Sequence, residues 1–419
     1  ITGLPAEAII GLARRYATTR PAMLKFADGM QRHFNGGQAV RALCCLPALV
    51  GQYGVPGGGL SYSTSGYIQW DAEELGHASA CPPVPRVVNM NRLGAALAGE
   101  VRDPPIMALY VYGANPVTSA PNAGLIVQGM LREDLFTVVH EQFMSDTARY
   151  ADIVLPATSQ LEQVDLHRPY GQRNLQYNQP AIAPLGECRS NWDTMRALAT
   201  AMGYEDPWLH ESAEQVIAQI IEASRPHNPQ LAGISYAQLR SAGTVPFTFG
   251  EDNHTPFADL RFPTPSGKVE LLCPAMAAQG VDPLPDYVPL PAADAGDAQQ
   301  PTLILISSAA HHFVSSSFAN QPSLRAKEGG PYIEINPADA AARGIADGAT
   351  VRVENARGHC LLRAVITSDV APGVAVAPKG HWASLSPDGR NINWTTSDEL
   401  ADLGGGSVFH SNRVQIGPA

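Results

Sequence analysis

One segment, residues 137–156 (TVVHEQFMSDTARYADIVLP), constrains the fold of this chain more than any other. It continues an apolar run, residues 135–139, that is short and rich in β-branched side chains, as in a buried parallel strand. Polar residues 140–142 follow where such a strand would end. A second apolar run, residues 153–155, stops at Pro156, which cannot donate a hydrogen bond to a strand ladder. The segment therefore predicts two neighbouring strands.

The sequence around this segment predicts an open α/β sheet. Upstream, the apolar run IMALYVY at residues 106–112 breaks at Gly113, so a further strand ends in a polar turn. Between the two downstream runs, Ser145 is expected to cap a short helix that has Asp146 in its first turn. Strands that each end in a polar turn are typical of doubly wound sheets, in which ligands bind at the carboxyl ends of the strands.

Composition excludes several classes of protein. The 419 residues include 28 Lys plus Arg and 39 Asp plus Glu, a formal net charge of −11, and no basic stripe stands out, so we expect no nucleic-acid partner. No apolar run reaches the length of a membrane span. The six cysteines contain no CxxC pair and fit neither a zinc nor an iron–sulfur site. We expect a cytoplasmic location, with the periplasm as the alternative.

The chain divides into two predicted domains. Residues 1–280 alternate helical and strand patterns, whereas residues 281–300 are rich in Pro, Ala and Asp and predict a linker. Residues 301–419 carry about six short strand patterns separated by turns, which predict a small closed barrel. Within the first domain, residues 159–184 have no clear period and are interpreted as a loop-rich excursion. Asn191 is expected to cap the helix that follows.

Four motifs in order carry a family resemblance: GANP at 113–116, VVHEQFMSDTARYADIVLPATSQLE at 138–162, PLGECRSNWD at 184–193 and TPSGKVEL at 264–271. This series resembles the molybdopterin oxidoreductase family of the dimethyl sulfoxide reductase, formate dehydrogenase and nitrate reductase type. The later HHFVSSSF and YIEINPADAAARGIADGATVRVENARG resemble the molybdopterin dinucleotide-binding barrel of that family. The resemblance covers essentially the whole chain.

The resemblance implies a fold and a chemistry. The fold is α/β, a doubly wound Rossmann-like sheet followed by a closed C-terminal β-barrel of the double-psi type. The implied cofactor is molybdenum (or tungsten) held by two molybdopterin guanine dinucleotides. The implied reaction is a two-electron oxidation or reduction of a small-molecule substrate, with an electron-transfer subunit as partner.

The family's N-terminal cysteine motif for a [4Fe–4S] cluster and its metal-ligating residue are not identifiable here. We therefore name no metal ligand, interpret the chain as the C-terminal portion of such an enzyme, and expect this portion alone to be inactive. One alternative is a cofactor-free structural subunit with the same fold. Another is a nucleotide-binding α/β protein of unrelated chemistry.

The strand ends supply the first candidate cofactor-binding residues. Gly113 lets the backbone approach a ligand, and Asn115 beside Pro116 is placed to hydrogen-bond a base edge; an ordinary turn is the alternative. Glu141 can accept hydrogen bonds from guanine N1–H and N2–H₂, or is a solvated strand end. Two further residues complete this pocket or cap local structure, and we favour the structural role: Thr147 and Asp152.

The barrel supplies the second group of candidates. His311, His312, Ser315 and Ser316 follow its first strand, and the resemblance makes their loop a pterin and phosphate contact with neutral donors. Neighbouring histidines on a strand point in different directions, which disfavours a zinc pair. Many relatives carry an arginine where Ser307 or Ser315 stands here. A serine-rich surface loop is the alternative.

Two more sets of residues follow from the resemblance. Trp382 and Asn393 match positions that close over a pterin, with core packing as the alternative for Trp382. Gln31, Arg32 and His33 resemble the turn that faces the metal, where they would orient the substrate or hold its negative charge. An ordinary polar turn accounts for these three equally well.

Overall fold

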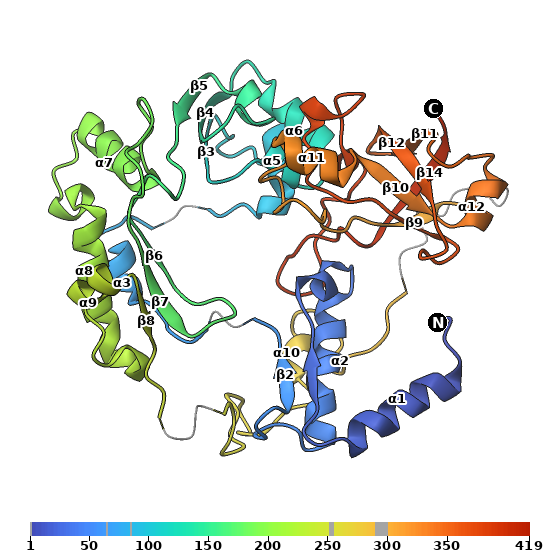
Figure 1. The fold of residues 1–419 in the computed structure, drawn as a ribbon, viewed down its shortest axis with the longest axis horizontal. Helices are drawn as coiled ribbons and strands as arrows, with labels where there is room; N and C mark the ends of the chain where they lie inside the picture. Colours follow the sequence, from blue (N-terminus) through green and yellow to red (C-terminus); the bar gives the residue numbers. More distant parts are fainter. Residues whose placement is uncertain (1, 64–65, 84–85, 251–254, 290–300) are drawn as a thin grey trace.

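The computed structural model describes residues 2–63, 66–83, 86–250, 255–289 and 301–419. Figure 1 shows the barrel beside a parallel sheet, with a second β-sheet and its helices at the opposite side of the molecule. None of the helices in these described ranges is long and apolar enough to cross a membrane.

The parallel sheet contains the three strands that the sequence predicts. Its order is β3 (Ala108–Tyr112), β4 (Phe136–Glu141) and β5 (Ile153–Pro156), all parallel. Short helices α5 (Pro116–Ser119) and α6 (Ala123–Met130) form the crossover between β3 and β4. The carboxyl ends of β3 and β4 therefore open at the same edge, as predicted.

The helix expected after Ser145 is only a 3₁₀ turn, η4 (Ala148–Tyr150). The Ser145 hydroxyl accepts the N–H of Ala148, but Asp146 precedes the turn and lies 2% exposed. Its carboxylate bonds to the barrel instead of stabilising a helix end, so the helical interpretation of Asp146 was wrong.

Residues 159–184 were expected to form a loop-rich excursion, but part of this range forms two strands of a second sheet. β6 (Asp165–His167), β7 (Asn174–Asn178) and β8 (Thr244–Pro246) pair antiparallel. Polar side chains alternate with the buried Leu175 and Tyr177 along β7, so the strand lacks a continuous apolar run. Two helices share a core with this sheet, α8 (Ala213–Ser224) and α9 (Tyr236–Ala242), and helix α7 (Asn191–Met202) belongs to the same subdomain.

Helix α7 begins one residue earlier in the chain than expected. Ser190 is its N-cap, because its hydroxyl accepts the N–H of Asp193, whereas Asn191 is the first helical residue. A hydroxyl at this position satisfies a helix N–H that has no partner within the helix.

The C-terminal domain is a closed barrel with the strand order β10-β12-β11-β14-β9-β13, which confirms the predicted architecture. Its core consists of buried aliphatic side chains such as Leu305, Ile333 and Val353. The strands are β9 (Leu303–Ile306), β10 (Tyr332–Ile335), β11 (Thr350–Asn355), β12 (Gly358–Ile366), β13 (Val374–Val376) and β14 (Asn412–Pro418). The helical turns around it are α11 (Pro322–Glu328), α12 (Pro337–Ala342), η8 (Ala383–Leu385) and η9 (Ile392–Trp394).

The N-terminal part forms a separate small unit. Strands β1 (Met23–Lys25) and β2 (Gly59–Ser61) pair in parallel around the turn η1 (Asp28–Arg32) and helix α2 (Gly36–Leu49). The remaining helical segments are α1 (Ala6–Thr18), α3 (Ala72–Gly76), η2 (Met90–Arg92), α4 (Leu93–Ala95), η3 (Ala96–Glu100), η5 (Pro207–His210), η6 (Arg225–His227), η7 (Pro229–Leu231) and α10 (Pro274–Ala277).

The first part of the expected linker contacts α2. Arg41 Nη2 donates to the carbonyl of Pro283 at 2.8 Å, and Gln38 Nε2 donates to that of Asp282 at 3.0 Å. Residues 290–300, the rest of the expected linker, lie outside the described residues. The boundary between residues 280 and 301 therefore stays a prediction.

Limited proteolysis checks this boundary. We expect the first cut between residues 289 and 301, because the sequence there has no core-forming pattern, whereas the barrel core is built entirely from residues beyond 302. Mass spectrometry should then identify a protected fragment that begins near residue 300. A first cut within β11 or β12 would contradict the boundary.

Candidate functional site

Three parts of the chain meet around the barrel: the carboxyl edge of β3 and β4, the η1 turn, and the loops that follow β9, β13 and η9. We call this region the seam and define it by residues 28–38, 113–118, 141–147, 307–318, 377–397 and 402–411. The carboxyl edge of the sheet and the barrel lie side by side in Figure 1.

A buried carboxylate joins the sheet to the barrel. Asp146 accepts the Thr118 hydroxyl at 2.7 Å from its own domain. From the barrel it accepts the N–H groups of Ala383 at 2.5 Å and Ser384 at 3.1 Å. A buried carboxylate is tolerated when several donors satisfy it, and charge-assisted bonds of this kind are short and strong. The seam geometry therefore depends on Asp146, which the sequence analysis did not assign to this role.

Two asparagines of the barrel complete this junction. Asn391 Nδ2 and Asn393 Nδ2 both donate to the carbonyl of Thr118, at 3.1 and 2.8 Å. Asn393 is fully buried, and its N–H donates to Asn391 Oδ1. Asn393, predicted to close over a pterin, thus lies inside the wall of the seam, where its amide holds the two domains together.

Asn115 and Thr147 form the sheet side of the same network. Asn115 Oδ1 accepts the Thr147 hydroxyl at 2.7 Å and the Thr147 N–H at 3.2 Å, and Asn115 Nδ2 donates to Thr118 Oγ1. The Thr147 hydroxyl also accepts the N–H of Val117. Asn115 is buried, so its side chain orders the turn around Pro116 rather than offering a free base-reading edge. The structural role expected for Thr147 matches its place here.

Gly113 and Glu141 face the open side of this edge. Gly113 has φ +59, and a Cβ built on it would meet no atom within 4 Å, so space remains beside its backbone. Glu141 ends β4, and one carboxylate oxygen accepts the N–H of Gln142 at 2.8 Å. Burial raises the pKa of Glu141, although the Gln142 N–H, His140 and Ser145 oppose this shift.

Asp152 lies away from these residues. Its carboxylate accepts the N–H of Thr137 at 2.7 Å, near the start of β4, and so fixes the register of β4 and β5. Because Glu141 and Gly113 lie at the carboxyl ends of their strands, Asp152 is at the opposite edge of the sheet. The structure does not bring Asp152 into the pocket, and its carboxylate bonds within the sheet instead.

The loop after β9 is held by a glutamate at the end of α11. Glu328, which is buried, accepts the N–H groups of His311 and His312 at 3.3 and 2.9 Å. The two imidazole rings lie edge to face with centroids 4.7 Å apart. No group of three or more His, Cys, Asp or Glu side chains within the described ranges is arranged to hold a metal ion.

The serine part of this loop packs against the loop after β13. Trp382 Nε1 donates to the carbonyl of Ser316 at 2.8 Å, and the Trp382 ring is buried in a small apolar cluster with Phe313. A Cβ on Gly380 would lie 2.1 Å from the Ser315 carbonyl, so only glycine fits there. Trp382 is therefore a packing residue that fixes the position of Ser315 and Ser316.

The η1 turn lies against the last loop of the barrel. The Phe409 ring has Arg32 above it at 5.7 Å and Lys379 Nζ at 3.9 Å from its centroid. The rings of His33 and His410 lie nearby, tilted by 56° with centroids 5.4 Å apart, and the His410 backbone N–H donates to the Arg32 carbonyl. Gln31, the third predicted residue of this turn, is exposed.

The positive charge of this cluster resides on Arg32 and partly on Lys379 near neutral pH, because the pKa values of His33 and His410 are lowered by burial. Burial, together with the nearby charge of Arg32, lowers the pKa of Lys379 to about 7. Burial lowers the pKa of His410 to about 4, with His33, Lys379 and Arg32 all acting in the same direction. No carboxylate forms an ion pair with Arg32 or Lys379 in the described part of the chain. Such an arrangement favours an anion, because an anion would relieve the repulsion.

One other observation fits the same interpretation. Ser307, at the end of β9, is fully buried and its hydroxyl has no hydrogen-bond partner within the described residues. The sequence analysis missed Lys379 and His410. Lys379 could have been noticed in the sequence as a single basic residue directly after the strand VAVAP. His410 has no such local pattern, because its neighbours in space come from distant segments.

A second carboxylate ties η1 and α2 to the barrel. Asp402 accepts the N–H groups of Gly37 at 2.7 Å and Gln38 at 3.0 Å, the first turn of α2. The helix N-cap, Asn35, makes no capping bond with its side chain, so Asp402 supplies the cap from a distant segment. Arg32 and His33 are thereby held at a fixed distance from His410.

Replacing Asp146 tests its role in the seam. Asp146→Ala leaves three donors unsatisfied, two of them backbone N–H groups, so we expect the free energy of unfolding to fall by about 1–3 kcal/mol. Urea unfolding measures this change. The matched control is Glu133→Gln at an exposed position, where a change within about 0.5 kcal/mol is expected. Equal stabilities of the two variants would show that Asp146 is not a structural tie.

The lowered pKa of Lys379 predicts a pH dependence of stability. Its folded pKa of about 7 lies below the ordinary 10.5, so the folded chain binds fewer protons than the unfolded chain between these values. Stability should therefore rise with pH across this interval. Lys379→Met should abolish that rise and be more stable than the unchanged chain near neutral pH.

Urea unfolding at several pH values measures this effect. The exposed Lys327 provides the control, since Lys327→Met should leave the pH profile as it is. If Lys379→Met and the unchanged chain have parallel profiles, the amino group is not desolvated as described.

Comparisons with known proteins agree with this geometry. Two family models match the chain: "Molybdopterin oxidoreductase" at residues 13–201 and "Molydopterin dinucleotide binding domain" at residues 303–413. The chain is 41% identical over 417 residues to the probable oxidoreductase YoaE of Bacillus subtilis, covering 99% of this chain and 59% of that protein. It is 33% identical over 437 residues to the biotin sulfoxide reductase of Cereibacter sphaeroides, covering 96% of this chain and 58% of that protein.

A solved structure shares the fold. Acetylene hydratase from Pelobacter acetylenicus matches all of this chain and 64% of its own chain with a TM-score of 0.76 at 21% identity. The chain thus spans somewhat more than half the length of the two curated relatives. The order of motifs, the barrel and both family models agree, and the chain belongs to the molybdopterin oxidoreductase family.

Proposed function

We propose that the seam holds a molybdenum bis(molybdopterin guanine dinucleotide) cofactor and that the complete protein is the catalytic subunit of an oxidoreductase. The observation that carries this proposal is the cluster of Arg32, His33, Lys379 and His410, in which neither Arg32 nor Lys379 has an acidic partner among the described residues. A cofactor with two diphosphate groups supplies the negative charge that this cluster lacks. Family membership supports the identity of that anion.

The residues present fit such a group. Gly113 has open space beside its backbone, and the Ser307 hydroxyl is buried without a partner among the described residues. Both are features that a polar ligand in the seam would use. The residues that would hold the cofactor are Gly113, Glu141, Ser307, His311, His312, Ser315, Ser316, Lys379 and Arg32. When bound, the cofactor supplies two-electron transfer at its metal.

The protein's own groups have separate tasks in this proposal. Glu141 accepts from guanine N1–H and N2–H₂, since it ends β4 beside the open edge at Gly113. Asn115 and Asn393 hold the walls, because their amides are already bonded within the seam. Arg32 and His33 stand beside the anion and orient a substrate there. Lys379, whose amino group lies desolvated near Arg32, would donate hydrogen bonds to a phosphate group as a cation, because a bound anion raises its pKa.

The substrate proposed is a small molecule that is reduced or oxidised by two electrons. A relative that is 33% identical is named for reduction of a sulfoxide, which supports a reductase. An electron-transfer subunit as partner, and a [4Fe–4S] cluster in a preceding segment, belong to the same proposal. Tungsten in place of molybdenum, and a cytoplasmic location, are also proposals that rest on the family resemblance.

Nucleotide binding tests the proposal without turnover. GDP, IDP and ADP are compared by isothermal titration calorimetry on the chain, because IDP lacks the guanine N2 amino group. We expect GDP to bind most tightly. Glu141→Ala should lower GDP affinity about 10- to 100-fold, since a charge-assisted bond contributes about 1.5–3 kcal/mol. The melting temperature should hardly change, because Glu141 is a strand end outside the core.

Glu187→Ala, at an exposed position outside the seam, should leave GDP affinity unchanged. If no guanine nucleotide binds, the cofactor-free structural subunit becomes the better account. If GDP binds but Glu141→Ala does not weaken it, another group reads the guanine.

A further inference from the structure

A cavity of about 330 Å³ lies in the β6–β8 subdomain, apart from the seam. It is partly open to solvent and is lined mainly by residues of β6, α7, α8 and α3, and none of its lining residues belongs to the seam. Its volume is at the lower end of the range for small-molecule sites. Its lining residues are Trp70, Leu75, Gln163, Val164, Asp165, Leu166, Ser190, Asn191, Trp192, Ala213, Val216, Ile217 and Ile220.

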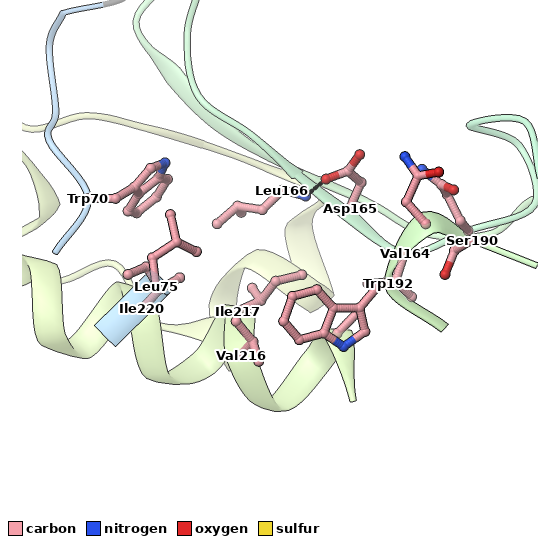
Figure 2. Close-up of a pocket in the computed structure, with 13 residues that line it drawn as sticks. Trp70, Leu75, Val164, Asp165, Leu166, Ser190, Trp192, Val216, Ile217 and Ile220 are labelled. Carbon is pink, nitrogen blue, oxygen red and sulfur yellow. Dashed lines mark hydrogen bonds between the residues drawn. The ribbon is translucent and has the colours of Figure 1, made fainter. Parts of the chain in front are cut away.

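The cavity has an apolar end and a polar end. Figure 2 shows Trp70, Leu75 and Ile220 at one end, and Asp165 and Ser190 at the other. Ile217, which lies between the two ends, and Ile220 at the apolar end are both buried, so they form a fixed aliphatic floor. A ligand that fits both ends has an apolar body and one polar group.

Asp165 is the one ionisable residue that lines this cavity. One carboxylate oxygen accepts the N–H of its neighbour Leu166 at 2.7 Å. No basic side chain of the described residues forms an ion pair with it. A carboxylate beside an apolar wall is best satisfied by a cation that also donates hydrogen bonds.

The helix ends near the cavity do not cancel this charge. The N-terminus of α7 is capped by Ser190, and Asp193 lies in its first turn. The N-terminus of α8 carries a capping box of Ser212 and Gln215, with Glu214 in its first turn. These helix ends already have their own hydrogen-bond acceptors and acidic residues. The carboxylate of Asp165 therefore makes the charge of the site negative.

We propose that this cavity binds a small organic ammonium ion with an aromatic or branched apolar body. The ammonium group bonds to the carboxylate of Asp165, and the body packs between Trp70 and Trp192 over the aliphatic floor. The indole faces add attraction for a cation, because aromatic rings carry negative charge on their faces. The site is independent of the proposed cofactor function.

The polarity of the ligand is tested with three probes of one shape. Phenethylamine, 2-phenylethanol and phenylacetate are titrated into the chain at low salt and neutral pH by isothermal titration calorimetry. We expect the amine to bind about tenfold or more tightly than the alcohol, and phenylacetate not to bind. Equal affinities for amine and alcohol, no binding of the amine at millimolar concentration, or tightest binding of phenylacetate would each overturn the proposal.

Variants place the binding in this cavity. Asp165→Asn keeps the shape and the acceptor for the Leu166 N–H, and should weaken the amine about tenfold while leaving the alcohol unchanged. The matched control, Asp206→Asn at an exposed position of the same subdomain, should change neither. Ala213→Leu, which fills part of the cavity with a good helix former, should weaken amine and alcohol together. Amine binding that survives both Asp165→Asn and Ala213→Leu would overturn the assignment.

Discussion

The arrangement of this molecule depends on a buried carboxylate. Asp146 lies between the parallel sheet and the barrel and accepts hydrogen bonds from both. A carboxylate in that position is stable only while the donors of both domains are present, so it couples the integrity of each domain to their contact. Asp402 does the same for α2, whose first N–H groups it caps from the barrel side. Two acidic side chains thereby hold three parts of the chain in one geometry.

The basic side chains of the seam, unlike these two carboxylates, lack partners of opposite charge among the described residues. Arg32, Lys379 and His410 are brought together by these ties, yet no acidic side chain of the described residues pairs with Arg32 or Lys379. The acids of this region are engaged with backbone N–H groups, which leaves the basic groups to a ligand. The two carboxylates Asp146 and Asp402 thus join the parts of the chain, whereas Arg32 and Lys379 have no acidic partner among the described residues.

The sequence predicted those features that local patterns encode. Apolar runs ending in polar turns correctly predicted β3, β4 and β5, and short alternating strands correctly predicted the barrel. The sheet of β6 and β7 was missed, because a strand such as NLQYN carries few apolar residues and its partners are antiparallel neighbours of mixed polarity. Local patterns also do not show contacts between distant segments. The partner of Asp146, Ala383, lies 237 residues further along the chain.

The order of strands in the barrel has a consequence for biosynthesis. β14 pairs with both β9 and β11, so it closes a ring whose other members lie earlier in the chain. Until residues 412–418 have been made, β9 and β11 each present an unpaired edge, and the segment carrying Asp402 and His410 has no second anchor. A ribosome adds residues from the N-terminus, so the parallel sheet can assemble well before the barrel. Lys379 and His410, which lie beside Arg32 in the seam, therefore take up their final positions only after residues 412–418 have been made, well after the parallel sheet.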